Sequence, residues 1–298
     1  MNEDRTARSP GILGSQLSRR SALGRLAGAG AIAALAATPF TRLSASASKL
    51  GVSMNQEASP SPITGTPTIV FVHGAWADNS GWTAVMKSLM ADGFEMVGVS
   101  NPLRGPAFDA AYVASLANTI PAPVLLVGHS YGGAVITAAG PQIPNAVGLV
   151  YVAGFAPDEG ESIQALADAG QPTLLGPALR PVPVVAGDAA AELFVDRASF
   201  HEVFCGDLSD EDAAVLAAIQ RPANAAGFGE PFGPAGWKTL PSWYAIATAD
   251  NTIGTENLRF MAQRAGSVTV DIDASHVVMI SQPEAIADLI RTAVGSLA

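Results

Sequence analysis

The sequence of 298 residues contains one cysteine and four histidines, and charged residues make up only 14% of it. With Cys205 as the single thiol, no disulfide can form within the chain. We expect Cys205 to be a small packed residue rather than a nucleophile. The scarcity of histidine also limits the candidates for a general base, which are His73, His129, His201 and His276.

Basic residues are also scarce, with 16 Lys and Arg against 26 Asp and Glu and a formal net charge of −10. Six of these arginines and only two acidic residues lie within residues 1–47, so the rest of the chain carries 10 basic and 24 acidic residues, net −14. A surface of this sign repels phosphate backbones, which excludes nucleic acid as the expected partner. It also disfavours anionic membranes and strongly anionic substrates.

The N-terminal region lacks an apolar run that could span a bilayer, because residues 26–37 are too few and too rich in Gly and Ala. Arg19-Arg20 precede this run, and the small residues 45–47 follow it. This pattern is typical of a twin-arginine signal peptide. We therefore expect residues 1–47 to engage the twin-arginine export machinery and to be cleaved after Ala47. The mature protein would then be periplasmic or secreted, without stable membrane insertion.

Residues 48–65 are rich in Ser, Pro, Gly and Thr and are predicted to be a flexible linker. From residue 66 to 298, apolar runs and helical patterns alternate along the chain. Strands are expected at 68–72, 94–99, 123–126, 146–153, 242–248 and 268–272, and helices at 82–90, 109–120, 134–139, 256–265 and 283–294. This alternation predicts an α/β domain built on a doubly wound, mainly parallel sheet.

The alternation breaks between residues 157 and 238, where Pro, Gly and Ala are frequent and short helical stretches occur. We find no convincing strand pattern in this segment. The segment follows a core strand, so we expect a small, mainly helical cap inserted over the carboxyl edge of the sheet.

A G-x-S-x-G motif, Gly128-His129-Ser130-Tyr131-Gly132, stands between an apolar strand and a helical pattern. This context is typical of a nucleophile elbow, a sharp and strained turn that exposes the serine hydroxyl at the top of a sheet. Ser130 is therefore the predicted nucleophile.

A serine hydroxyl needs a base within hydrogen-bond reach, and the base needs an orienting carboxylate. On this type of sheet the three residues follow the chain order Ser, acid, His. His276 follows the last predicted strand and is therefore the predicted base. Asp250 follows the preceding strand and is the predicted acid, with Asp158 as the alternative. His129 lies inside the elbow and cannot turn back onto the hydroxyl of its neighbour.

The oxyanion of a tetrahedral intermediate needs preorganised backbone N–H donors. We assign these to Tyr131, directly after the nucleophile, and to Ala75, in the loop after the first strand. Gly74 allows close approach of the chain there, and His73 is expected to stabilise the turn. Trp76, Phe155 and Trp237 are predicted to contact substrate. Further apolar candidates in the cap are Leu174, Leu175, Phe194, Phe200, Phe228 and Phe232.

With these residues placed, residues 67–295 resemble the α/β-hydrolase superfamily. More narrowly, the chain is similar to the compact branch that contains plant methyl-ester esterases, hydroxynitrile lyases and related bacterial esterases. The resemblance is carried by residues 72–76, 128–133, 249–253 and 275–277. It implies a serine hydrolase without a cofactor, and we expect no metal; the apolar cap candidates suggest an apolar, uncharged ester of small or medium size, cleaved through an acyl-enzyme. Ser130, Asp250 and His276 would form the triad, and Ala75 and Tyr131 would donate to the oxyanion.

Two positions separate esterases from lyases in that branch. The lyases resemble a pattern that has Thr where this chain has Gly74, and Lys where this chain has Val277. That lysine supplies a cation near the leaving cyanide. Val277 cannot supply one, so ester hydrolysis is favoured. A lyase or other non-hydrolytic enzyme, a lactonase or amidase, and a binding protein without turnover remain alternatives.

Overall fold

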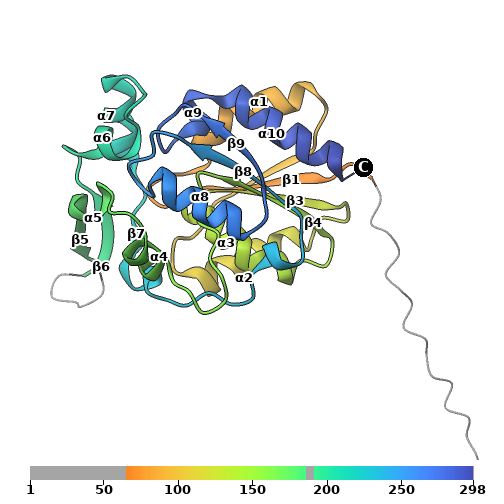
Figure 1. Ribbon diagram of the computed structural model, residues 1–298, viewed down its shortest axis with the longest axis horizontal. Coiled ribbons are helices and arrows are strands. Elements are labelled where there is room, and N and C mark those ends of the chain that lie inside the picture. The colour runs from red at the N-terminus through yellow and green to blue at the C-terminus, as the bar shows by residue number, and fades with distance from the viewer. Residues whose placement is uncertain (1–64, 186–190, 298) are drawn as a thin grey trace, which may run out of the picture. The chain divides into compact units, whose positions relative to one another are not determined.

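The computed structural model describes residues 65–185 and 191–297 (Figure 1). The predicted signal peptide, and all of the predicted linker except residue 65, lie outside these described residues. Within them, no helix is long and apolar enough to cross a membrane.

A six-stranded sheet in the order β2-β1-β3-β4-β8-β9 forms the centre of the domain, and every neighbouring pair is parallel. Its inner strands are continuous apolar runs because both faces are covered, as is usual for parallel sheets. The bounds are β1 (Thr68–Val72), β2 (Met96–Val99), β3 (Val124–His129), β4 (Ala146–Val152), β8 (Ser242–Ala247) and β9 (Val268–Ile272).

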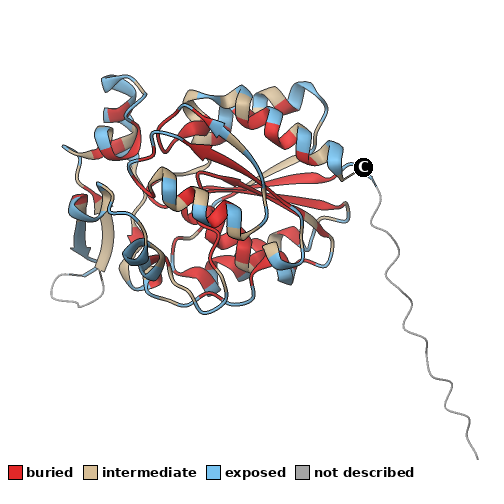
Figure 2. Ribbon diagram, in the orientation of Figure 1, coloured by how far each residue is buried: buried red, intermediate tan, exposed pale blue. Residues whose placement is uncertain are grey.

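Helices cover both faces of this sheet, which confirms the predicted doubly wound α/β fold (Figure 1). α1 (Thr83–Ala91) and α10 (Pro283–Ser296) pack together on one face, and α2 (Pro106–Ala117) and α3 (Tyr131–Ala139) on the other. Their buried sides face the strands (Figure 2). The other helical elements outside the cap are η1 (Asn79–Trp82), η2 (Gly140–Gln142), α8 (Thr255–Arg264) and α9 (Val278–Ser281).

The segment between β4 and β8 forms the cap, and most of its regular structure is helical. Its helices are α4 (Ile163–Ala169), α5 (Leu175–Ala178), α6 (Phe200–Phe204), α7 (Asp210–Ile219), η3 (Ala225–Phe228) and η4 (Gly236–Lys238). The prediction that it has no strand is wrong, because an antiparallel sheet in the order β5-β6-β7 lies within it. Its strands are β5 (Leu179–Pro183), β6 (Ala191–Val195) and β7 (Ala223–Asn224).

The cap strands escape prediction because β5 contains Pro181 and Pro183, which usually argue against a strand. β5 pairs only with β6 and is therefore an edge strand, where proline is tolerated because its missing N–H faces away from the partner. Four of the five residues of β5 are exposed, so it also lacks the apolar run of a core strand.

The strand order places a switch point between β1 and β3. The chain leaves β1 toward β2 on one side and continues from β3 toward β4 on the other. Ligands of open α/β sheets bind in the crevice outside the carboxyl ends of the strands at such a point. The loop after β1 begins at His73, and the residue after β3 is Ser130.

Candidate active site

Ser130 occupies a strained backbone conformation, with φ 53° and ψ −123°, at the N-terminus of α3. A non-glycine residue holds such angles only where its surroundings enforce them. Close packing of the elbow does so here: a Cβ added to Gly128 would lie 2.5 Å from the carbonyl oxygen of Gly132. A Cβ on Gly132 would in turn collide with the carbonyl of Val72. The glycines of the motif therefore permit the turn that presents Ser130.

His276 and Asp250 form a directly bonded pair with no exposed side-chain surface, in which His276 Nδ1 lies 2.7 Å from Asp250 Oδ2. The other carboxylate oxygen accepts the backbone N–H groups of Thr252 and Ile253, each at 2.7 Å. Both oxygens of Asp250 are thus satisfied, and the carboxylate is fixed in orientation.

The protonation of this pair follows from its contacts. Burial alone would raise the pKa of Asp250, but His276 and the backbone N–H donors outweigh it, so the pKa lies below its usual value. Asp250 is therefore ionised at neutral pH, and the Nδ1–H of His276 donates to it. In the neutral imidazole this leaves the lone pair on Nε2.

His276 Nε2 is buried and has no hydrogen-bond partner within residues 65–185 and 191–297. A buried polar atom without a partner costs about 1–3 kcal/mol and is uncommon outside functional sites. The Ser130 hydroxyl and Nε2 are not hydrogen-bonded to each other in this structure. Such bonds are often long before substrate binds.

The backbone N–H groups of Ala75 and Tyr131 are both available as donors. Tyr131 is the first residue of α3, so its N–H has no acceptor inside the helix. The N–H of Ala75 has no acceptor among the described residues. Both residues line the same pocket as Ser130. The phenol of Tyr131 donates to the buried Asp109 over 2.8 Å, which anchors this residue.

His73 stabilises the loop after β1 and is not placed as a base. Its Nδ1 donates to the carbonyl of Gly74 over 2.8 Å, and its Nε2 accepts from Arg221 Nη1 over 2.9 Å. Burial, aided by the charge of Arg221, lowers the pKa of His73 to about 4. His73 is therefore neutral and ties the loop to the cap residue Arg221.

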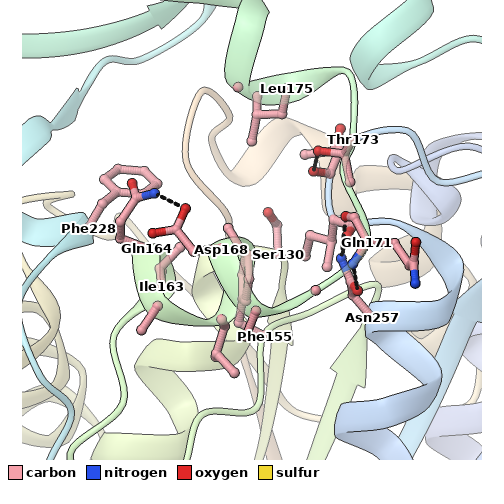
Figure 3. Close-up of a pocket in the computed structure, with 18 of the residues that line it drawn as sticks. Ser130, Phe155, Ile163, Gln164, Asp168, Gln171, Thr173, Leu175, Phe228 and Asn257 are labelled. Atoms are coloured by element: carbon pink, nitrogen blue, oxygen red, sulfur yellow. Dashed lines mark hydrogen bonds between the residues drawn. The ribbon is translucent and has the colours of Figure 1, made fainter.

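A pocket of about 920 Å³ opens above Ser130 between the sheet edge and the cap (Figure 3). Trp76 and Phe155, which are predicted to contact substrate, line it, and so do the cap residues Leu175 and Phe228. Phe228 stacks on Trp76, with 5.9 Å between ring centroids and 24° between planes. These rings form an aromatic wall in the pocket that Ala75 and Tyr131 also line.

Trp237 does not line this pocket, in contrast to the prediction. Its indole N–H donates to the carbonyl of Pro157 over 2.9 Å, and the guanidinium of Arg264 lies 5.7 Å from its ring centroid. These two contacts hold the ring of Trp237 beside Pro157 and Arg264. The other predicted cap residues that do not line the pocket are Leu174, Phe194, Phe200 and Phe232.

The polar part of the pocket wall was not predicted from the sequence. Figure 3 shows Gln164 and Asp168 on one side of Ser130, and Gln171 and Asn257 on the other. Gln164 Nε2 donates to Asp168 over 2.7 Å, and Asn257 Oδ1 accepts the backbone N–H of Gln171 over 2.8 Å. Gln164 and Asp168 on α4 and Asn257 on α8 look in sequence like solvated helix positions, and Gln171 lies in the loop after α4. Only the packing of these segments brings the four residues to the pocket.

Asp158, the alternative acid, lies away from His276. Its carboxylate bonds to Lys238, and its side chain is 31% exposed. No group of three or more His, Cys, Asp or Glu side chains within the described part of the chain is arranged to hold a metal ion.

The fold and the elbow define a hydrolase-type α/β sheet with a serine at its switch point. The family model described as "Alpha/beta hydrolase family" matches residues 69–289, and the chain belongs to this family.

Three relatives illustrate the likeness. A carbendazim-hydrolysing esterase of Nocardioides sp. (strain SG-4G) is 52% identical over 44 residues, which span 14% of this chain and only 18% of that protein. A pyrethroid hydrolase of Sphingobium faniae JZ-2 matches with a TM-score of 0.66 and 22% identity, covering 77% of this chain and 97% of that one. A methylesterase of Arabidopsis matches with a TM-score of 0.64 and 20% identity, covering 77% and 99%. The two structural matches support the fold.

Proposed function

We propose that this protein is a serine hydrolase that cleaves carboxylic esters through an acyl-enzyme. The observation that carries the proposal is the buried Asp250–His276 pair, whose geometry leaves His276 Nε2 without a partner at the sheet edge that bears Ser130. A fixed imidazole with a free lone pair is what activation of a serine hydroxyl requires.

In the proposed reaction, Ser130 Oγ attacks the ester carbonyl while His276 Nε2 takes the hydroxyl proton. The resulting oxyanion accepts hydrogen bonds from the N–H groups of Ala75 and Tyr131, each contributing about 3 kcal/mol. The alcohol leaves with the proton from His276. Water then attacks the acyl-enzyme with the same base and releases the acid. Asp250 stabilises the imidazolium that forms in both halves.

The pocket supports uncharged esters with an aromatic or alkyl group. The stacked Trp76 and Phe228 offer an apolar surface beside the oxyanion donors. Asp168 and Glu256 line the pocket, and no Lys, Arg or His does so among the described residues. A substrate carboxylate would therefore meet like charge without a counterion. The names of the relatives, which hydrolyse pyrethroids or carbendazim or act as methylesterases, agree with neutral substrates.

The alternative of a hydroxynitrile lyase is disfavoured at both diagnostic positions. A side chain at Gly74 would place its Cβ 2.7 Å from the Cβ of Ser130, so threonine does not fit this loop. Val277 is 1% exposed and presents an apolar side chain next to His276.

The test is hydrolysis of p-nitrophenyl acetate, butyrate and octanoate by the chain from residue 48 and by its Ser130→Ala variant. Ser130→Ala should lower kcat by about 10⁶-fold and abolish labelling by a fluorophosphonate. Ser296→Ala, an exposed serine on α10, is the matched control. Equal turnover by wild type and Ser130→Ala would reject the proposal, as would cyanide release from a cyanohydrin without ester hydrolysis.

We also propose that the chain is exported before it acts. The support is the sequence of residues 1–47, which lie outside the described residues. Replacement of Arg19-Arg20 by Lys-Lys should retain the precursor in the cytoplasm, which cell fractionation would detect. Efficient export of that variant would contradict a twin-arginine route.

A further inference from the structure

The loop that carries His276 is held by a residue of the cap. Asp207 lies between α6 and α7, far from His276 in the sequence. Its Oδ2 accepts the backbone N–H of Ser275 over 3.0 Å, and its Oδ1 accepts the Ser275 hydroxyl. Ser275 is 5% exposed and directly precedes His276. Asp207 thus fixes the residue that directly precedes His276.

The same loop is also held from the nucleophile elbow. His129 Nε2–H donates to the backbone carbonyl of His276 over 3.0 Å, and the centroids of the two rings lie 4.7 Å apart. His129 is fully buried, and burial together with the neighbouring His276 keeps its pKa well below the usual value. His129 is therefore a neutral donor. Because it directly precedes Ser130, its bond to the His276 carbonyl joins the nucleophile elbow to the loop that carries His276.

The cap segment around Asp207 reaches the other loops of the site as well. In the acid loop, Thr252 Oγ1 donates to the carbonyl of Val203 over 2.7 Å, and Asn251 Nδ2 donates to that of Glu202 over 3.0 Å. In the loop after β1, His73 accepts from Arg221. One stretch of the cap, residues 202–221, therefore contacts the loops that carry the base, the acid and an oxyanion donor.

We propose that Asp207 is a positioning residue that sets the orientation of His276 through Ser275, with His129 fixing the same loop from the elbow. The inference rests on the proposed serine-hydrolase function. The Ser275–His276 backbone is bonded at consecutive residues to two different parts of the molecule. Release of the cap bond frees Ser275, while Ala274 stays bonded to Ala249 and His276 to Asp250 and His129, so the backbone directly before His276 would shift. A displacement of the His276 side chain by about 1 Å can cost about 10²-fold in rate, because the reacting atoms must be held in the correct geometry.

The test compares Asp207→Ala and Asp207→Asn with Asp210→Asn. Asp210 lies on the same cap segment and contacts His201, so its variant controls for a change of charge on the cap. Asp207→Ala should lower kcat on p-nitrophenyl butyrate about 10- to 100-fold with KM unchanged. Asp207→Asn keeps one acceptor oxygen and should recover part of this loss. Asp210→Asn should behave as wild type.

Single-turnover acylation separates positioning from stability. Partial unfolding lowers the amplitude of the p-nitrophenol burst, whereas misplacement of His276 lowers its rate constant. We expect a slower burst of normal amplitude for Asp207→Asn. Ser275→Ala removes the hydroxyl bond but leaves the backbone N–H bond to Asp207, so it should slow the burst less than Asp207→Ala does. The Asp207→Ala/Ser275→Ala double variant should lose less than the product of the two single losses, because both changes remove the hydroxyl bond.

The outcomes are distinct. An unchanged burst rate in Asp207→Asn and Asp207→Ala, or a loss of amplitude alone, would overturn the positioning role while leaving the hydrolase intact. Turnover by wild type that survives Ser130→Ala would overturn the proposed function itself, and with it this inference.

Discussion

The sheet edge and the cap are built on different physical principles. The strands that carry the site are continuous apolar runs; every residue of β3 is buried, and the loops at its end have little freedom. The cap strand β5 is mostly exposed, and α7 buries only Ala213 and Ala217. The cap meets the sheet edge through a few buried rings, such as Phe204 against Trp76, and through polar contacts such as Asp207–Ser275 and Arg221–His73. The apolar strands thus place the residues of the sheet edge, whereas aromatic and polar contacts together join the cap to them.

The sharpest test of the sheet edge is the choice of acid. Asp250→Asn keeps the shape of the pair but replaces a carboxylate oxygen by an amide, which favours the wrong tautomer of His276. We expect kcat to fall by about 10⁴-fold. Asp158→Asn, the same change at the residue bonded to Lys238, should leave kcat within about threefold, since a half-exposed ion pair contributes little. Steady-state hydrolysis of p-nitrophenyl butyrate decides between them, and the reverse order would assign the acid to the cap side.

The second test concerns how tightly the loop after β1 approaches the elbow. Gly74→Ala would place a Cβ 2.7 Å from the Cβ of Ser130 and 3.1 Å from the carbonyl oxygen of His129. The loop must then move away from the nucleophile, and kcat should fall by about 10²-fold. Gly206→Ala, on the cap, meets no atom closer than 3.7 Å and is the control. Equal activity of both variants would show that the approach is not needed.

The third test is the pH dependence of the free energy of unfolding. It concerns His73, which joins the loop after β1 to the cap residue Arg221. The pKa of His73 falls from 6.5 to about 4 on folding, so the unfolded chain binds more protons in this range. Stability is therefore full above about pH 6.5 and declines as the pH falls toward 4, by at most about 3 kcal/mol from this group. The buried His129 acts in the same direction at lower pH.

His73→Gln should flatten this decline between pH 7 and pH 4.5, as measured by urea unfolding at both values. His201→Gln removes a histidine from the cap surface and controls for the loss of a titratable group as such. Identical pH slopes for wild type and His73→Gln would contradict a buried neutral imidazole at this position.

The smallest expected effect concerns the pocket wall. Phe228→Ala removes a ring that stacks on Trp76 and should raise KM for p-nitrophenyl esters about 3- to 10-fold, with kcat little changed. Trp237→Phe should leave KM as it is, because Trp237 faces Pro157 and Arg264 rather than the pocket. A higher KM for Trp237→Phe alone would restore the original sequence prediction.

The sheet and the nucleophile elbow could be predicted from the sequence, whereas the contacts of the cap could not. The parallel sheet was predictable because buried strands such as Thr68–Val72 are short apolar runs. Ser130 was predictable because its strained turn demands small residues at fixed spacing. The roles of Ser130, Asp250 and His276 remain predictions, although the structure brings Asp250 and His276 into direct contact.

The cap resisted prediction because its contacts depend on tertiary packing. Strand β5 is interrupted by prolines, and its pairing with β6 is visible only in three dimensions. Trp237 is a large aromatic residue of the kind that often lines an apolar pocket. Its contacts with Pro157 and Arg264 set the orientation of its ring, and these contacts are not visible in the sequence. Nothing in the sequence around Asp207 indicates that it reaches Ser275, which lies 68 positions further along the chain.

The two ends of the cap lie together, since the indole N–H of Trp237 donates to the carbonyl of Pro157 over 2.9 Å. In topology it is therefore an exchangeable module, whose two ends already lie side by side whatever is inserted between them. Its bonds to Ser275, Thr252 and His73 make it less exchangeable in practice. A chimera that receives a foreign cap would need apolar side chains in the places of Phe200, Val203 and Phe204, and a carboxylate and a guanidinium in the places of Asp207 and Arg221. Exchange of substrate specificity by cap replacement is thus constrained by a few defined contacts rather than by the size of the inserted segment.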